Sequence, residues 1–186
     1  MFLISELCTQ QAQHALSLSR EKALFVGSAC SGYLTGFGAS LFEWQKVQRG
    51  AASAIAATAR SSPILSRRVS IMHGAGLRNA VFDSTFFGSE YQARTRLGLP
   101  PAVSYGCAAA LAVTIDYPLD VAVKNLMAAP VHEPAPPGGA LGLLASIVRD
   151  RRLLIFAGLG AKCAEFALSY GVTGWSSTYV RSALGA

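Results

Sequence analysis

The chain has 186 residues, of which 52% are hydrophobic and only 14% are charged, and its formal net charge is +6. Soluble proteins carry charge on about a quarter of their residues, so this composition argues against an ordinary soluble domain. The length allows one domain with a substantial core. The excess of basic residues does not indicate nucleic-acid binding, because the cations flank apolar runs and are not interleaved with aromatic residues.

A polar leader is followed by long apolar runs that alternate with basic stretches. Residues 23–42 and 97–115 contain no charged residue, and about 20 apolar residues suffice for a helix to cross a membrane. Residues 74–94 and 158–180 are apolar with a few charges, as expected of helices that face lipid on one side and protein on the other. We therefore expect an all-α membrane protein with about four transmembrane helices and short surface helices.

The two halves of the chain share an order of features, which predicts an internal repeat. Glu43 and Asp120 lie 77 positions apart, and Gly74 and Gly158 lie 84 apart. The difference fits an insertion in a loop rich in proline and glycine, where insertions are tolerated. One supersecondary unit used twice gives such a pattern. The expected divisions are a leader over residues 1–22 and repeats over residues 23–98 and 99–186.

The motifs at these equivalent positions resemble those of the mitochondrial carrier family. Each repeat of that family has a long helix kinked at P-x-[DE]-x-x-[KR], then a short surface helix, and then an aromatic-[KR]-G junction that leads into a second helix. The second half has Pro118-Leu119-Asp120-Val121, and the first half has Leu41-Phe42-Glu43 followed by Lys46. Degraded junctions are found at His73-Gly74 and Phe156-Ala157-Gly158. Proline removes a backbone donor, so a helix kink is expected at Pro118.

The resemblance implies remnants of a gate made of salt bridges. In the family, the acid and the base of each kinked helix pair in a ring that closes one side of the transporter. The corresponding residues here are Glu43, Lys46, Asp120 and Lys124. Lys124 is one residue late, and one residue is about 100° of helix rotation, so it is expected to point away from the ring. We expect Glu43 to pair with Lys46, and Asp120 to pair with a cation from this or another subunit.

The resemblance also implies a bound lipid and two former substrate contacts. Family members hold cardiolipin at glycine-led helix starts, and the equivalent residues with their basic neighbours are Arg67, Arg68, Gly74, Arg151, Arg152 and Gly158. Cardiolipin or another anionic lipid is thus the expected ligand, with no other cofactor and no metal. Arg78 and Lys162 match positions that often contact substrate. We expect them instead to pair with Asp83 and Glu165 or with lipid phosphate.

Two repeats are one fewer than a transporting carrier has, and this decides the expected function. A chain with two thirds of the helices and few of the gate residues is expected to have lost transport. The main hypothesis is a structural accessory subunit, a multi-pass protein of the mitochondrial inner membrane. Its host would be a respiratory-chain complex, a supercomplex or the ATP synthase. Its expected partners are other membrane subunits and lipid. The alternatives are a solute carrier of the same membrane that works as a homo-oligomer, and a soluble helical adaptor.

No enzyme is expected from the sequence. It has no evident pairing of nucleophile and base, and the glycine-rich residues 27–38 lie in an apolar run and do not follow a strand, as a dinucleotide-binding loop would. The four cysteines have neither metal-ligand nor redox-motif spacing. Cys30 and Cys107 occupy equivalent repeat positions and are expected to act as small packing residues.

Overall fold

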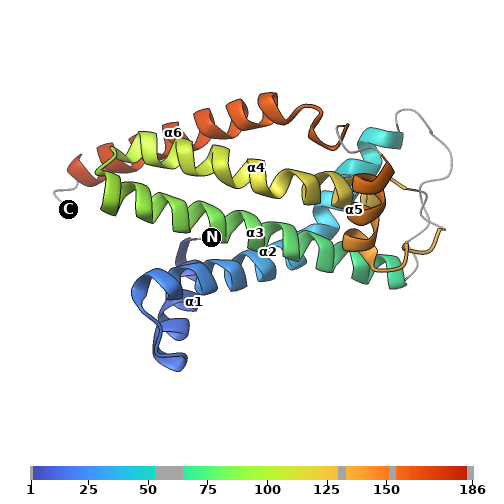
Figure 1. Ribbon diagram of the computed structural model, residues 1–186, viewed down its shortest axis with the longest axis horizontal. Helices are drawn as coiled ribbons and strands as arrows, with labels where there is room; N and C mark the ends of the chain where they lie inside the picture. Colours follow the sequence, from blue (N-terminus) through green and yellow to red (C-terminus); the bar gives the residue numbers. More distant parts are fainter. Residues whose placement is uncertain (1, 53–64, 130–132, 151–153, 184–186) are drawn as a thin grey trace. The chain divides into compact units, whose positions relative to one another are not determined.

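The structure is a computed structural model, and it describes residues 2–52, 65–129, 133–150 and 154–183 (Figure 1). Every regular element within these ranges is helical, which confirms the predicted all-α class for this part of the chain. The elements are α1 (Phe2–Ala15), α2 (Arg20–Ala52), α3 (Leu65–Leu97), α4 (Pro101–Ala128), α5 (Gly139–Asp150), the 3-10 turn η1 (Leu154–Phe156) and α6 (Leu159–Ala183).

The connection between α3 and α4 falls at the expected division between the repeats. Gly98 has a φ of 62°, a conformation that glycine adopts without strain and that commonly ends a helix. The backbone N–H of Leu99 then donates to the carbonyl of Ala93 at 3.2 Å. Pro101 is the first residue of α4, where its missing N–H costs nothing. Local chemistry therefore explains the sharp turn between two long helices.

Gly74 does not begin a helix, contrary to the prediction for residues 74–94. α3 begins at Leu65, and Gly74 lies buried well inside it. A side chain at Gly74 would approach the Cβ of Ala140 to 2.8 Å and Cγ2 of Val123 to 3.1 Å. Glycine at this position therefore serves close packing within a continuous helix. The carrier-like junction did not predict where the helix starts, because the residues before it also favour a helix.

Within the described residues, α4 is the helix that is long and apolar enough to cross a membrane. The expectation of about four such helices is not met by length and hydropathy. The charge-free run in α2 has glycine and serine among its apolar residues, which lowers its mean hydropathy. α3 and α6 carry charged residues along their length. α4 continues through Pro118, the residue at which a kink is expected.

The chain divides into two compact units that cut across the expected repeats. Unit 1 comprises Met1–Ser31, Val81–Asp116 and Gly158–Ala186, and unit 2 comprises Gly32–Ala80 and Tyr117–Ala157. α2, α3 and α4 each contribute one segment to each unit. Each unit thus combines residues from both halves of the sequence.

The core of unit 1 is a cluster of aromatic rings packed on alanines of α4. Phe86 is buried together with Ala108, Ala109 and Ala112. The partly buried rings that surround it are Phe82, Phe87, Tyr105, Phe166 and Tyr170. Phe86 meets the Tyr170 ring edge to face at 4.8 Å between centroids. Alanine leaves room for rings, and edge-to-face pairs add to the energy of burial.

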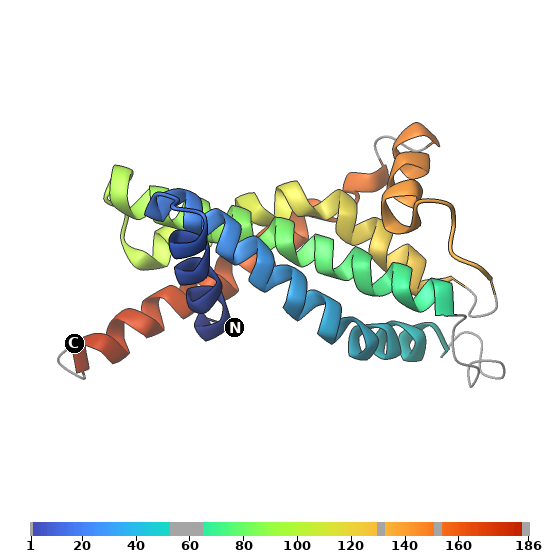
Figure 2. The same ribbon diagram turned by 90° about the horizontal axis from the view of Figure 1, so that it is seen from below.

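Unit 2 packs the second half of α2, the first half of α3, the second half of α4, and α5. α3 lies between α2 and α4 in Figure 2, and α5 packs on it at Gly74. Gly36 faces the backbone carbonyl of Ala75, where no side chain would fit, and Gly76 packs against Tyr33. Small residues at such positions let helix backbones come close together. The side chains buried completely in this unit include Arg67, Ile71, Val123, Leu126 and Met127.

Candidate functional site

Two acidic residues from the expected kink motifs share one cation in unit 2. Arg78 on α3 binds Glu43 on α2 through two parallel hydrogen bonds, Nη1 to Oε1 at 2.7 Å and Nη2 to Oε2 at 2.8 Å. The same Nη1 also reaches Oδ1 of Asp120 on α4 at 3.2 Å. A planar guanidinium suits this fork-to-carboxylate geometry better than an ammonium does. Three helices are thus tied together at one side chain.

A second cation completes the cluster. Lys124 donates to Oδ2 of Asp120 at 2.6 Å, from one helical turn further along α4. The sequence argument expected Lys124 to point away from the gate ring. Residues four apart lie on the same helix face, so Lys124 reaches Asp120 within its own helix even though it is out of the family's register. The two cations and two anions give the cluster a net charge of zero.

Lys46 does not make the ion pair predicted for it. Among the salt bridges of the described residues, Glu43 is joined to Arg78, while Lys46 is exposed. The Arg78 side chain is only 12% exposed and offers two donors at once, so it binds Glu43 better than a solvated lysine at i+3 would. The prediction that Glu43 would pair within its own motif was therefore wrong.

Asn79 is a member of the cluster that the sequence argument missed. Its side-chain oxygen accepts from Nε of Arg78 at 3.1 Å and from Nη2 at 3.0 Å. Its Cβ also lies where a side chain at Gly36 would stand, so it packs at the contact of α2 with α3. The sequence alone does not show that Arg78 is withdrawn from solvent, so it gave no reason to single out the neighbouring amide of Asn79.

The cluster is mostly withdrawn from solvent except at Lys124, whose side chain is 45% exposed. Side-chain exposure is 12% for Arg78, 13% for Asp120 and 30% for Glu43. Charges at this depth are stable only while they are paired, because burial of a lone charge costs several kcal/mol, on the order of 3–5 for one lost partner. An anionic solute could reach Arg78 only by displacing a carboxylate. The arrangement therefore favours a fixed structural bond over exchangeable binding.

Arg67 has a structural role that differs from the predicted one. Its guanidinium is buried, and it donates to the backbone carbonyls of Leu126 at 3.0 Å and Glu133 at 2.7 Å. These acceptors lie at the end of α4 and in the segment after it, where helix carbonyls lack intrahelical donors. Arg67 therefore fastens α3 to the end of α4 and is not turned outward to bind lipid. Arg68, the next residue, is half-buried.

The other residues predicted to bind lipid have mixed outcomes. Gly158, with a φ of 86°, stands directly before α6, so this glycine does lead a helix as expected. Gly74 lies inside α3. Arg151 and Arg152 fall outside the described residues. The structure thus places one of the two predicted glycines at a helix start.

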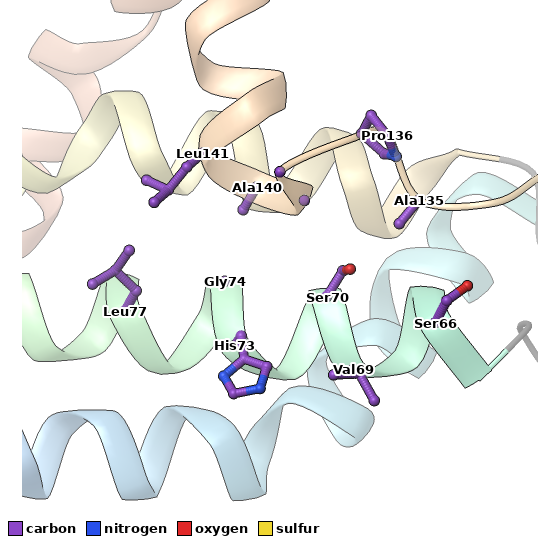
Figure 3. Close-up of a pocket in the computed structure, with 12 residues that line it drawn as sticks. Ser66, Val69, Ser70, His73, Gly74, Leu77, Ala135, Pro136, Ala140 and Leu141 are labelled. Carbon is purple, nitrogen blue, oxygen red and sulfur yellow. The ribbon is translucent and has the colours of Figure 1, made fainter.

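A groove of about 430 Å³ lies in unit 2 between the first half of α3 and the start of α5 (Figure 3). Its walls are mainly apolar and include Val69, Leu77, Pro136, Ala140 and Leu141. His73 is at its edge, but the imidazole points to the opposite side of α3, where Nδ1 is hydrogen-bonded to the hydroxyl of Tyr33. The groove therefore offers apolar walls rather than a set of catalytic groups.

The two predicted substrate-contact remnants lie in different units and have different partners. Lys162 on α6, in unit 1, pairs with Glu165 at 3.1 Å and lies over the Phe166 ring at 4.5 Å from its centroid. That pairing is one of those expected from the sequence. Arg78 pairs with Glu43 and Asp120, not with Asp83. Within the described residues, no group of three or more histidine, cysteine or acidic side chains could hold a metal ion.

Comparison with models of known protein families, with curated proteins and with solved structures finds no match to this chain. The geometry of the cluster and of the helix surfaces is therefore the basis for any functional conclusion.

Proposed function

We propose that this protein is a non-transporting, carrier-derived structural subunit of a mitochondrial inner-membrane complex. The observation that carries the proposal is the shared guanidinium of Arg78, which binds both Glu43 and Asp120. These acids are the equivalent residues of the two expected kink motifs. Their meeting at one cation supports a two-repeat arrangement with carrier-like ancestry.

The same bond argues against transport. Alternating access requires networks that open and close around a central site, so their ion pairs must be exchangeable. Arg78 holds one carboxylate with two hydrogen bonds and a second carboxylate with another, and Asn79 adds two more. Opening this cluster would leave buried charges without partners. A permanently closed bond is better suited to a structural subunit than to a gate.

Large apolar side chains on the helix surfaces support a membrane location. They occur on α2, on α4 and on α6, where Trp175 and Tyr179 stack on each other. Phe42 has 70% of its surface exposed, and the other large exposed side chains on these helices include Leu34, Leu41, Leu111, Ile115, Leu168 and Val172. Lipid or a partner subunit would cover these side chains, and large apolar patches on proteins usually mark such contacts. Such surfaces suit a subunit that is enclosed by lipid and by other membrane proteins.

The groove beside α5 is the place where we propose that an anionic lipid binds. Its apolar walls suit an acyl chain. Arg68 is two residues from the groove residues Ser66 and Ser70, on the other side of α3, so a phosphate that it binds would lie outside the groove. Arg67 is held by two carbonyls and does not supply a cation for the lipid. This assignment replaces the one based on glycine-led helix starts.

Carbonate extraction followed by native electrophoresis of gently solubilised membranes tests the proposed function. We expect the tagged protein to stay in the membrane pellet and then to migrate with a complex far larger than a single chain of 19.5 kDa. An Arg94→Ala variant, altered at an exposed ion pair, is the matched control and should migrate as wild type. Release by carbonate, or migration as a lone small protein, would contradict the proposal.

Liposome uptake separates this function from that of a homo-oligomeric solute carrier. Purified protein would be reconstituted and tested with labelled ADP, phosphate and malate. We expect no uptake above that of empty liposomes. Uptake by the wild type that is lost in Arg78→Ala and Lys162→Ala variants would show a transporter and overturn the structural assignment.

A further inference from the structure

α1 and α2 are in backbone contact within unit 1. A side chain at Gly27 of α2 would collide with the backbone of Thr9 of α1. Packed helices usually keep their axes about 8–10 Å apart, and glycine allows a closer approach. The buried neighbours of these two residues are also small, and they are Ser5, Ala12, Ala23 and Ser31.

Two cysteines lie beside this contact, one on each helix. Cys8 precedes Thr9 and shares a helix face with Ser5 and Ala12, from which it is three and four residues away. Cys30 follows Gly27 by three residues, so it lies on the same face of α2. Cys8 is partly exposed and Cys30 is exposed. Neither thiol is enclosed by the part of the chain that the structure describes.

The Cys8 thiol is also influenced electrostatically by Cys30. Burial raises the pKa of the Cys8 thiol, and the charge of the Cys30 thiolate raises it further. A disulfide requires Cα atoms about 4.4–6.8 Å apart, a separation that helices in backbone contact can provide. The sequence argument instead treated Cys30 as equivalent to Cys107, as a packing residue. Both are exposed, and Cys30 lies on the face of α2 that holds Gly27, close to where α1 is in contact.

We propose that Cys8 and Cys30 are a redox-active pair that forms a reversible disulfide and fastens α1 to α2. The oxidant is a low-molecular-weight disulfide such as oxidised glutathione. The exposed Cys30 thiolate attacks one sulfur of glutathione disulfide, and one glutathione thiolate leaves. The Cys8 thiolate then attacks the Cys30 sulfur and expels the second glutathione. Two protein thiols lose two protons and two electrons, and one glutathione disulfide becomes two glutathione thiols.

The other two cysteines of the chain lie on α4 and α6. Cys163 on α6 lies against α4, with its sulfur 3.5 Å from the Thr114 hydroxyl and 3.7 Å from the Ala110 carbonyl. Cys107 is exposed on α4. They therefore provide internal controls for the selectivity of the reaction.

The test is peptide mapping by mass spectrometry of the full-length protein in detergent after exposure to oxidised glutathione. We expect an intramolecular crosslink between the Cys8 and Cys30 peptides that dithiothreitol removes. It should exceed every other cysteine pair by about tenfold or more, because thiols held side by side have a high effective concentration. A Cys8→Ser variant should stop at a glutathione adduct on Cys30. A Cys107→Ser variant should form the crosslink as wild type does.

Two results would overturn the proposal. One is accumulation of a glutathione adduct on Cys30 of the wild-type protein without the crosslink. The other is crosslinks distributed evenly among all four cysteines, as in a control oxidised in denaturant. The proposed structural function does not depend on either result, since it is tested by migration with a large complex.

Discussion

Each of the two units of this protein is stabilised internally by a different kind of interaction. Unit 2 joins three helices at one guanidinium, and the Arg78 side chain is only 12% exposed. Unit 1 packs aromatic rings on alanines, and its ion pairs are peripheral, as shown by an Arg96 side chain that is 65% exposed. The same three long helices contribute to both units. The same helices are therefore stabilised by a cluster of ion pairs in unit 2 and by packed aromatic rings in unit 1.

This contrast predicts that loss of a cation has a larger effect in unit 2 than in unit 1. In unit 2, removal of Arg78 takes the shared cation from Glu43 and Asp120, and Asp120 keeps only its ion pair with Lys124. In unit 1, removal of a peripheral cation leaves a solvated carboxylate at the surface. Exposed ion pairs contribute roughly 0–1 kcal/mol, whereas loss of one partner from a buried cluster costs about 3–5 kcal/mol.

The largest effect is expected from Arg78→Ala, which should lower the free energy of unfolding by about 3–5 kcal/mol, because Glu43 and Asp120 lose their shared partner. Thermal or urea unfolding of the detergent-solubilised protein, followed by circular dichroism, measures the change. Arg94→Ala is the matched control, with an expected loss of about 0.5 kcal/mol or less. Equal losses in the two variants would remove the distinction between a central and a peripheral cation.

A smaller loss is expected from Arg67→Ala, about 1–3 kcal/mol, because the carbonyls of Leu126 and Glu133 lose a buried donor. The neighbouring Arg68→Ala variant should keep the stability of the wild type but bind less cardiolipin in a lipid-retention assay. If Arg67→Ala lost lipid without losing stability, the sequence-based assignment of Arg67 to lipid would be restored.

Gly36→Ala should also cost about 1–3 kcal/mol, because the added methyl group collides with the backbone carbonyl of Ala75, which cannot move aside easily. Gly38 lies two residues away in the same helix, with open space where a side chain would stand. Gly38→Ala should therefore raise stability by about 0.5–1 kcal/mol through helix propensity. Similar changes in both variants would show that α2 and α3 are not in close contact at Gly36.

In unit 1, Phe86→Leu should cost about 0.5–1.5 kcal/mol, because leucine keeps most of the volume but loses the edge-to-face contacts with Tyr105 and Tyr170. This loss should be the same in low and high salt, while the small effect of Arg94→Ala, at an exposed ion pair, should fall as the salt concentration rises. Unfolding midpoints measured at two salt concentrations test the difference. A salt-dependent effect of Phe86→Leu would contradict the contrast between the units.

Much of the helical architecture was predictable from the sequence, because proline and glycine residues bound the long apolar runs that form the helices. The connection at Gly98 and Pro101 is of this kind. The start of α3 was not predictable, since Gly74 has the same local chemistry at a helix start as at a packing contact. Only the positions of Val123 and Ala140 decide between the two.

For the cluster, the residue types were predictable and the pairing was not. The motif spacing identified Glu43 and Asp120, and the repeat singled out Arg78. That Arg78 would bind both acids depends on how three helices pack, which sequence spacing does not encode. The aromatic cluster had a weak signal in the four-residue spacing of Phe82 with Phe86 and of Phe166 with Tyr170. That spacing places rings on one helix face but does not name the helix they meet.

Crosslinking mass spectrometry of native membranes tests the central claim most directly. The exposed lysines Lys22, Lys46 and Lys124 give an amine-reactive crosslinker sites in both units. A structural subunit that is enclosed by other membrane proteins should give reproducible crosslinks from these lysines to a different polypeptide of one complex. Crosslinks confined to this chain or to a second copy of it would contradict that account.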